Sequence, residues 1–385
     1  MRILSGFNLS LVFGFLFTTT INAQDATSTF LRSGVGDANK LIGAYAEPLL
    51  QSFGAGLNSG WFQTAKPHGA LGMSLTISSN FILVPNDAKT FDINSLGLSP
   101  NVRLVSGSNI TPTVFGNKNN NSDVGLYARV ADGGPDTLLL RQPLPSGTGL
   151  SFLPLPTAQF SIGIGLNSEL SIRFLPEIKS GDYDVNMIGF GGKFEFKEWI
   201  PVMKKMPFNL SAQFGFTQFN AYYKPSQLQA QQSDNYTYNP NNGKQYNNQE
   251  LTFESTAWTA NLIISKKLAF FTPYLGVGYQ QATTKLNLEG EYPVTDVNQN
   301  VDYTAVFGTP NYNANNANSH PLIVRENKDP VAVSATLSGL RATAGFRLKF
   351  TVFTLHADYT MSAGGFNVVS AGLGLNVQSL LPPKL

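Results

Sequence analysis

The 385-residue sequence contains no cysteine and little charge. Without cysteine the chain can form neither disulfide bonds nor thiolate metal sites, and it cannot carry a lipid on a cysteine after export. Charged residues make up 13% of the chain, about half of their usual share in globular proteins. The formal net charge of +2 gives no electrostatic reason to expect nucleic acid as a partner.

Long apolar runs are also missing. After the first 23 residues no stretch of about eighteen apolar residues occurs, so we expect no membrane-spanning helix. The first residues instead have the pattern of a secretory signal peptide, with a positive Arg2, an apolar stretch at 9–17 and small or polar residues before Gln24. We expect residues 1–23 to be removed on export, and an uncleaved anchor is the alternative.

What the sequence does contain is a repeated alternation of apolar and polar residues from Gly69 onwards. In residues 345–350, three large apolar side chains alternate with glycine, arginine and lysine. Because successive side chains of a strand point to opposite faces, aromatic residues gather on one face and charges, glycines and hydroxyls on the other. One face then suits lipid and the other water. The pattern predicts an all-β fold, an antiparallel transmembrane β-barrel formed by residues 69–385.

Ten segments alternate strongly, and two weaker ones, residues 101–106 and 123–130, would bring the number to twelve. We predict ten to fourteen strands, with twelve as the best single number. Long connections follow the first, fifth and seventh strong strands, whereas connections after even-numbered strands are short. Because bacterial barrels have long external loops and short periplasmic turns, this parity places both termini in the periplasm. The predicted long extracellular loops are residues 85–157, 225–248 and 293–332.

Residues 24–68 precede every predicted strand and carry apolar residues at helical spacing. Asp37 is placed to cap this helix, Pro48 interrupts it, and Gly54 with Gly56 ends it. We expect the segment either to plug the lumen or to lie beneath the barrel as a periplasmic cap.

The polar face of the predicted strands carries ten titratable side chains that we expect to face the lumen. These candidates are Glu169, Arg173, Lys193, Glu195, Lys197, Arg341, Arg347, Lys349, His356 and Asp358. Lysine and arginine account for six of the ten, which would favour anionic solutes in an open pore. The alternative is a closed lumen in which these charges pair across neighbouring strands, because small barrels are commonly filled by side chains.

No catalytic or metal-binding motif accompanies the three histidines. For His356 and Asp358, two residues apart, a hydrogen bond in the lumen is favoured over a metal or proton site. Ser334 or Ser338 with His356 would supply a nucleophile and a base, but nothing marks either serine as activated. The glycine-rich residues 189–192 lie within a predicted strand, where glycine lets strands coil or leaves room for a plug. We expect no enzyme, no metal and no cofactor.

A resemblance to a known family is carried by five stretches: residues 37–41, 60–62, 66–68, 111–116 and 172–176. Through them the chain resembles an uncharacterised family of Bacteroidota outer-membrane β-barrel proteins, which implies a barrel and no established activity. A looser similarity to long-chain fatty-acid transporter barrels, which carry an N-terminal segment in the lumen, implies uptake of hydrophobic molecules. The chain departs from that group in its final residues, which lack the usual terminal aromatic.

Together these observations predict an integral protein of the Gram-negative outer membrane, in contact with its lipid. We expect a plugged or narrow channel for the uptake of small solutes, hydrophobic or anionic. The alternative is a non-transporting barrel that presents its loops, rich in asparagine, glutamine and tyrosine, to protein partners of unknown identity. A soluble secreted β-sandwich is disfavoured, because its aromatic rows would need burial that the charged reverse face denies.

Overall fold

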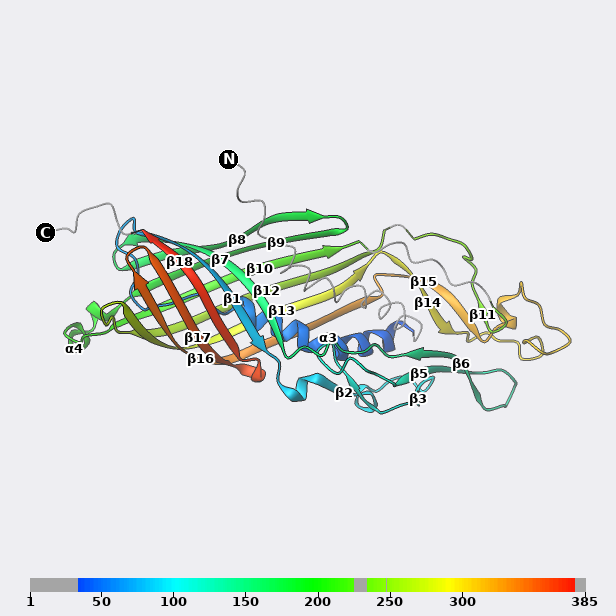
Figure 1. Cartoon of the computed structure of the whole chain (residues 1–385). Helices are drawn as coiled ribbons and strands as arrows, with labels where there is room; N and C mark the ends of the chain where they lie inside the picture. The colour runs from blue at the N-terminus through cyan, green and yellow to red at the C-terminus, as the bar shows by residue number, and fades with distance from the viewer. Residues whose placement is uncertain (1–33, 225–233, 247, 378–385) are drawn as a thin grey trace.

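The computed structural model describes residues 34–224, 234–246 and 248–377. Within them, ten antiparallel strands close into a barrel in which the first and last strands pair (Figure 1). In ring order these strands are β1 (Met73–Leu83), β7 (Phe152–Gly165), β8 (Ser168–Ser180), β9 (Tyr183–Glu195), β10 (Asn209–Tyr223), β12 (Glu250–Ser265), β13 (Phe271–Glu289), β16 (Val331–Phe350), β17 (Phe353–Ser362) and β18 (Val368–Val377). The predicted signal peptide lies outside the described residues.

The number of barrel strands, ten in the described residues, falls within the predicted range, but the best single prediction of twelve is wrong. Both weak candidates do form strands, β3 (Val102–Ser106) and β5 (Asp123–Arg129), which pair with each other in a separate sheet. In that sheet β5 also pairs with β6 (Asp136–Pro143). β3 and β5 have five and seven residues, whereas crossing a bilayer takes about 9–11. Alternation therefore marks these segments as strands without saying which sheet they join.

The outward faces of the barrel strands form an apolar belt. Leu75 of β1, Val277 of β13 and Leu373 of β18 are 45%, 59% and 63% exposed. Apolar side chains this exposed around a whole ring are the lipid-facing surface of a transmembrane barrel. At one end of the belt, the exposed Trp199 next to the short helix α4 (Pro201–Lys204) occupies the position of an interfacial aromatic anchor.

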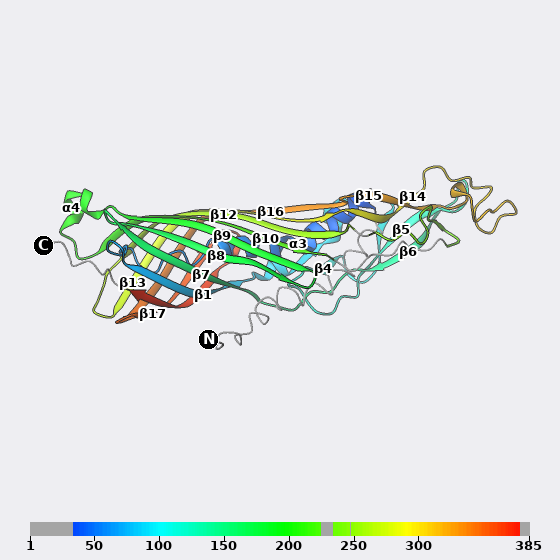
Figure 2. The same ribbon diagram turned by 90° about the horizontal axis from the view of Figure 1, so that it is seen from above.

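The two ends of the barrel differ in the length of their connections (Figure 2). The described parts of connections 84–151, 224–249 and 290–330 lie at one end, which we call the loop end. The opposite end, the turn end, carries α4 and tight turns such as residues 351–352. The remaining elements are β2 (Thr90–Asp92), β4 (Ile110–Pro112), β11 (Thr237–Tyr238), β14 (Glu291–Val297) and β15 (Leu322–Lys328), with short 3-10 helices η1 (Asn86–Lys89), η2 (Ile93–Leu96), η3 (Lys197–Trp199), η4 (Ala317–Ser319) and η5 (Ala363–Gly365).

Helix α3 (Val35–Leu57) is longer than predicted. Its N-cap is Gly34 and not Asp37, whose buried carboxylate lies in the first turn and accepts a hydrogen bond from the backbone N–H of Ser99 at 3.0 Å. Pro48 lies inside the helix without ending it. No helix among the described residues is long and apolar enough to span a membrane.

Gly54 and Gly56, predicted to end the helix, lie within it because α3 approaches the barrel wall closely there. A Cβ on Gly54 would lie 2.5 Å from the Cβ of Ala282 on β13, and one on Gly56 would lie 2.7 Å from Cδ1 of Ile82 on β1. A larger side chain at either position would push the helix away from the wall. The two glycines therefore serve close packing and not helix termination.

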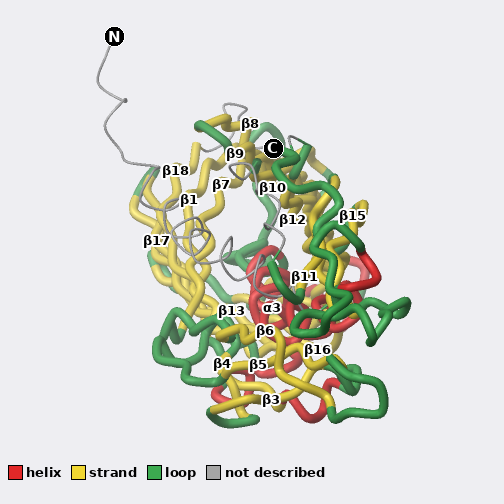
Figure 3. Tube along the Cα trace, turned by 90° about the vertical axis from the view of Figure 1, so that its right-hand side faces the viewer, coloured by secondary structure: helices red, strands yellow, loops and turns green. Residues whose placement is uncertain are grey.

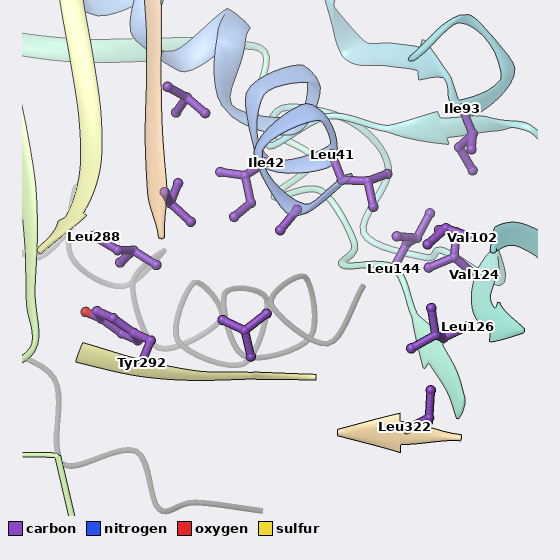
Figure 4. Packing of buried hydrophobic residues seen from close by; sticks show 14 of the residues in the cluster. Leu41, Ile42, Ile93, Val102, Val124, Leu126, Leu144, Leu288, Tyr292 and Leu322 are labelled. Atoms are coloured by element: carbon purple, nitrogen blue, oxygen red, sulfur yellow. The ribbon is translucent and has the colours of Figure 1, made fainter. Parts of the chain in front are cut away.

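Seen along the barrel, α3 lies inside the ring, beside β13 and β16 (Figure 3). Its C-terminal half packs into an apolar cluster with inward-facing residues of the ring, among them Phe53 against Phe219 at 4.6 Å between ring centroids. Its N-terminal half packs against the long strands on one side and connection 84–151 on the other. Figure 4 shows Leu41 directed toward Leu144 of that connection, in a second apolar cluster.

Replacing Val277 with arginine tests the lipid-facing belt. An arginine near the middle of the lipid-facing wall should lower the free energy of unfolding by about 2–4 kcal/mol. Ala332→Arg is the control, because Ala332 faces outward on the neighbouring strand beside polar, exposed residues toward the loop end. Ala332→Arg should lower the free energy of unfolding by about 1 kcal/mol or less. Urea unfolding in lipid vesicles measures both, and equal costs would contradict the placement of the belt.

Candidate functional site

Residues 34–68, which we call the luminal segment, consist of α3 and the stretch that follows it. The last carbonyl groups of a helix have no helical partner, and here they lie inside the barrel. Arg173 on β8 donates hydrogen bonds to the carbonyl oxygens of Leu57 at 2.9 Å and Ser59 at 2.7 Å. Arg341 on β16 donates to the carbonyl oxygen of Asn58 at 2.5 Å. Because β8 and β16 are the third and eighth of ten strands in the ring, the two guanidinium groups approach from opposite walls.

We call Arg173, Arg341 and the carbonyl groups that they bind the arginine latch. The two side chains are only 0% and 5% exposed, and neither forms an ion pair within the described part of the chain. A buried charge without compensation is costly, so the carbonyl groups must supply it. A helix C-terminus carries about half a negative elementary charge, which matches a cation placed there. The ring of Trp61 adds a cation–π contact, 3.8 Å from the Arg173 guanidinium carbon.

Glutamine side chains on the wall also accept hydrogen bonds from both arginines. Gln159 accepts a hydrogen bond from Arg173 at 3.1 Å, and Gln280 accepts one from Arg341 at 3.2 Å. Each guanidinium group is therefore held by the wall and by the luminal segment together. The latch fixes the end of α3 across the full width of the lumen.

Glycines on the inner wall receive the aromatic side chains that follow the latch. A Cβ on Gly191 or Gly215 would lie 2.6 Å or 2.5 Å from the ring of Trp61, and one on Gly276 would lie 2.6 Å from the ring of Phe62. These glycines thus form slots in the wall of β9, β10 and β13. Gly191 belongs to the glycine-rich run in which we expected room for a plug.

A second set of polar contacts holds the end of the luminal segment. Nδ1 of His68 lies 2.6 Å from a carboxylate oxygen of Glu169, which also accepts from the His68 backbone N–H at 3.0 Å. Lys193 on β9 pairs with the same carboxylate at 3.0 Å. The amide of Asn376 on β18 lies 2.8 Å from the other ring nitrogen of His68. We call these four residues the histidine anchor.

At the loop end, connection 84–151 covers the luminal segment. The hydroxyl of Tyr45 donates to the carbonyl oxygen of Ser146 at 2.9 Å, and the backbone N–H of Val114 donates to the carbonyl of Tyr45 at 3.0 Å. Burial raises the pKa of Tyr45 to about 12, so its hydroxyl stays protonated at physiological pH. The luminal segment is thus held by apolar packing toward the loop end, and by polar contacts and the small cluster around Trp61 and Phe62 toward the turn end.

The structure places nine of the ten candidate residues at inward positions of barrel strands. The exception is Lys197, because β9 ends at Glu195 and Lys197 falls in η3 at the turn end, where it donates to the carbonyl of Met206 at 3.2 Å. Glu195 accepts a hydrogen bond from Asn209 at 2.6 Å. The latch and the anchor contain four of the others: Arg173, Arg341, Glu169 and Lys193.

The remaining four candidates lie together near the turn end. Arg347 pairs with His356 across β16 and β17, Lys349 donates to Asn376 at 3.2 Å, and Tyr274 donates to Asp358 at 2.9 Å. His356 and Asp358 form no hydrogen bond with each other among the contacts of the described chain, so the bond expected between them is not formed.

The structure does not bring a serine nucleophile to His356. Ser334 and Ser338 face outward on β16 and are exposed, whereas His356 faces inward on β17. The barrel wall therefore separates them. Among the described residues, no group of three or more histidine, aspartate or glutamate side chains is arranged to hold a metal ion.

The alternation of apolar and polar residues gave no indication of Trp61 and His68. Both lie on a stretch without strand periodicity, so the pattern that located the wall says nothing of what the wall binds. A usable signal was present in the inward glycines, since glycine in a strand commonly marks the close approach of another group.

A ring of strands with an apolar belt, filled by its own luminal segment, defines the protein as a transmembrane β-barrel of the outer-membrane type. Residues 1–377 match a family of unknown function, DUF6588, and the chain belongs to that family. No curated protein sequence matches the chain.

Several solved outer-membrane structures are similar to this chain. The attachment invasion locus protein Ail of Yersinia pestis is 9% identical, with a TM-score of 0.23 over 80% of this chain and 98% of that one. The translocator domain of autotransporter NalP from Neisseria meningitidis is 8% identical, with a TM-score of 0.29 over 86% and 94%. A FadL homologue of Pseudomonas aeruginosa is 10% identical, with a TM-score of 0.20 over 80% and 89%.

The fit of Trp61 into its slot predicts a compensating pair of substitutions. Trp61→Ala should empty the slot and lower the free energy of unfolding by about 3 kcal/mol, and Gly215→Leu should collide with the indole ring. The double variant refills the slot, so its loss should be smaller than the sum of the single losses by about 1 kcal/mol or more. Urea unfolding measures all three.

Gly192→Leu is the matched control for this pair. A Cβ on Gly192 would lie 4.0 Å from its nearest neighbours, so a larger side chain finds space there. Its unfolding free energy should change little, with or without Trp61→Ala. Strictly additive losses of unfolding free energy for Trp61→Ala and Gly215→Leu would show that the two side-chain positions are not in contact.

Proposed function

We propose that the protein is an outer-membrane channel, closed by its own N-terminal segment, which admits small solutes when that segment moves. In this proposal residues 1–23 are the export signal, residues 24–68 form the plug and residues 69–385 form the barrel. The loop end faces outward from the cell and the turn end faces the periplasm, as the lengths of the connections favour.

The arginine latch is the observation that supports this proposal. Small barrels are commonly filled by side chains of their own walls, which leave nothing to displace. Here the filling is a separate stretch of chain, and its turn-end half is held by hydrogen bonds, which water can replace, and by one small apolar cluster around Trp61 and Phe62. The two larger apolar clusters lie in the loop-end half. A segment held in this way can be released from one end.

Removing the latch should open the channel. Hydrogen bonds to charged groups contribute about 1.5–3 kcal/mol each, so removing both arginines with Arg173→Gln and Arg341→Gln should raise the open fraction by at least about a hundredfold. Conductance across planar bilayers measures this fraction, and liposome swelling reports the passage of uncharged solutes. Lys197→Gln is the control, because Lys197 lies outside the lumen.

A reversible cross-link identifies the path of that conductance. Because the chain has no cysteine, Thr64→Cys in the turn-end half of the luminal segment with Ser265→Cys on β12 introduces a single disulfide. The hydroxyl oxygens of Thr64 and Ser265 lie 3.1 Å apart, so two sulfur atoms at these positions are within reach of such a bond. In the latch variant, oxidation should abolish conductance and reduction should restore it. A folded latch variant as impermeable as the wild type, or a conductance indifferent to oxidation, would contradict the proposal.

A second function, recognition of a protein partner, is favoured by an aromatic cluster at the loop end. Phe307 lies between Tyr236 and Tyr312, with ring centroids 5.7 Å and 5.4 Å away, and it is 43% exposed. Exposed aromatic side chains of this kind are common binding anchors. The cluster is held by loop contacts that the barrel does not need.

Phe307→Ser with Tyr236→Ser should then reduce capture of partner proteins by intact cells by about thirtyfold or more, since an aromatic anchor commonly contributes 2 kcal/mol or more. Channel conductance should be unchanged. Ile110→Ser is the control, because Ile110 is 48% exposed on β4 in another loop sheet. Equal capture by the Phe307/Tyr236 double variant, the Ile110→Ser control and the wild type would contradict a partner-binding role of the aromatic cluster.

A further inference from the structure

The turn end of the lumen holds a group of cationic side chains outside the arginine latch, one of which, Lys349, also donates to Asn376 of the histidine anchor at 3.2 Å. Arg347 and Lys349 follow one another on the inward face of β16, and His356 pairs directly with Arg347 across β16 and β17. Directly opposed side chains on one face of a sheet lie about 5 Å apart at their Cβ atoms. The three side chains thus form one group.

Two members of this group carry buried nitrogen atoms that have no hydrogen-bond partner among the described residues. His356 is only 4% exposed, and neither of its ring nitrogens has a hydrogen-bond partner. The Nε of Arg347 is likewise buried and unpartnered. Buried polar groups are nearly always hydrogen-bonded, because leaving one unsatisfied costs about 1–3 kcal/mol. The fold alone does not satisfy these atoms.

The carboxylates of the lumen are engaged elsewhere. Asp358, the next inward residue of β17, accepts the hydroxyl of Tyr274. Glu169 is shared by His68 and Lys193, and Glu195 is bound by Asn209. No carboxylate of the described chain forms an ion pair with Arg347 or Lys349.

The inward charges of the wall are also out of balance. The inward cations are five: Arg173, Lys193, Arg341, Arg347 and Lys349. The inward candidate anions are three: Glu169, Glu195 and Asp358. The difference, five minus three, leaves an excess of two positive charges with histidine neutral, and the latch neutralises part of it with carbonyl groups. The remaining excess is concentrated at Arg347 and Lys349.

Glycines shape the wall around this group. A Cβ on Gly372 would lie 2.4 Å from Cε1 of His356, and one on Gly345 would lie 2.7 Å from Cζ of Tyr274. Both rings therefore lie close against the wall. Buried Thr272 pairs with Arg347 and contributes a hydroxyl to the same row.

We propose that Arg347, His356 and Lys349 bind a small oxyanion, of the phosphate or carboxylate type, at the turn end of the lumen. The planar guanidinium group matches two oxygens of such an anion, and lysine adds a point charge. In either tautomer, one imidazole nitrogen of His356 carries a proton to donate. The site deepens the proposed channel function by naming the charge of its solute, and it depends on that function for transport but not for binding.

Thermal unfolding in detergent tests the binding. Inorganic phosphate and acetate should each raise the midpoint of the wild-type protein by several degrees, because a ligand of the native state stabilises it. Chloride at equal ionic strength should raise it less, since it cannot use the guanidinium fork. Arg347→Gln and His356→Gln should each weaken binding by at least about tenfold. Lys197→Gln, which removes a cation at the same end outside the lumen, should leave binding unchanged.

Arg347→Lys keeps the charge but removes the planar fork, so it should weaken binding by an intermediate factor and covers the case in which Arg347→Gln does not fold. A stronger effect of phosphate than of acetate would assign the site to phosphate-type anions, and the reverse order to carboxylates. Equal shifts from chloride, unchanged binding in Arg347→Gln or Arg347→Lys, or no shift with either oxyanion would overturn the site.

Ion selectivity separates this site from the channel proposal. With the arginine latch removed, the open channel should prefer anions to cations, and adding Arg347→Gln should lower that preference severalfold. Oxyanion binding without any conductance would leave the site standing and overturn the channel. Conductance without oxyanion binding, and with ion selectivity unaffected by Arg347→Gln, would support the channel and overturn the oxyanion site.

Discussion

A helix that ends inside a barrel must have its last carbonyl groups satisfied by the wall, and this requirement organises the lumen. The free carbonyl groups at the end of α3 carry partial negative charge, and no backbone N–H of the described wall strands donates to them. Arg173 and Arg341 meet them from opposite sides of the ring. Because the carbonyl groups serve as their counter-charge, these two arginines need no carboxylate. The inner wall can therefore carry more cations than anions, because carbonyl groups compensate the charges of these two arginines.

The same requirement explains why the inner wall changes character along its length. On β1 the inward residues are polar from Ser74 to Asn80 and then apolar at Ile82. The apolar part faces the sides of α3, whereas the polar part faces the chain after the helix ends, where Asn80 donates to the carbonyl of Gly56 at 3.0 Å. The inner wall thus follows the luminal segment: apolar beside a helix, and hydrogen-bonding beside an irregular backbone.

The period of two allowed the strands, and the side of the wall on which most charges lie, to be predicted from the sequence, because both depend only on neighbours along the chain. It could not tell that β3 and β5 pair outside the ring, since pairing is a tertiary choice. It also could not supply the partners of the charges: Arg173 binds a carbonyl 116 positions away, on a stretch with no strand pattern. The sequence pattern predicts a helix that Pro48 interrupts and that Gly54 and Gly56 end, whereas packing against the wall keeps all three residues inside α3.

The positions of the cations show which part of the lumen the fold itself requires. Removing Arg173 or Arg341 would leave helix carbonyl groups unsatisfied, so folding alone is sufficient reason for both. Arg347 and His356 satisfy no group of the luminal segment and no carboxylate in the described chain, yet they are kept in the wall with buried, unpartnered nitrogens. Apolar residues at these two positions would destabilise the fold less than buried, unpartnered polar groups do. The turn end of the lumen is therefore the place where the barrel carries polar groups for something other than its own stability.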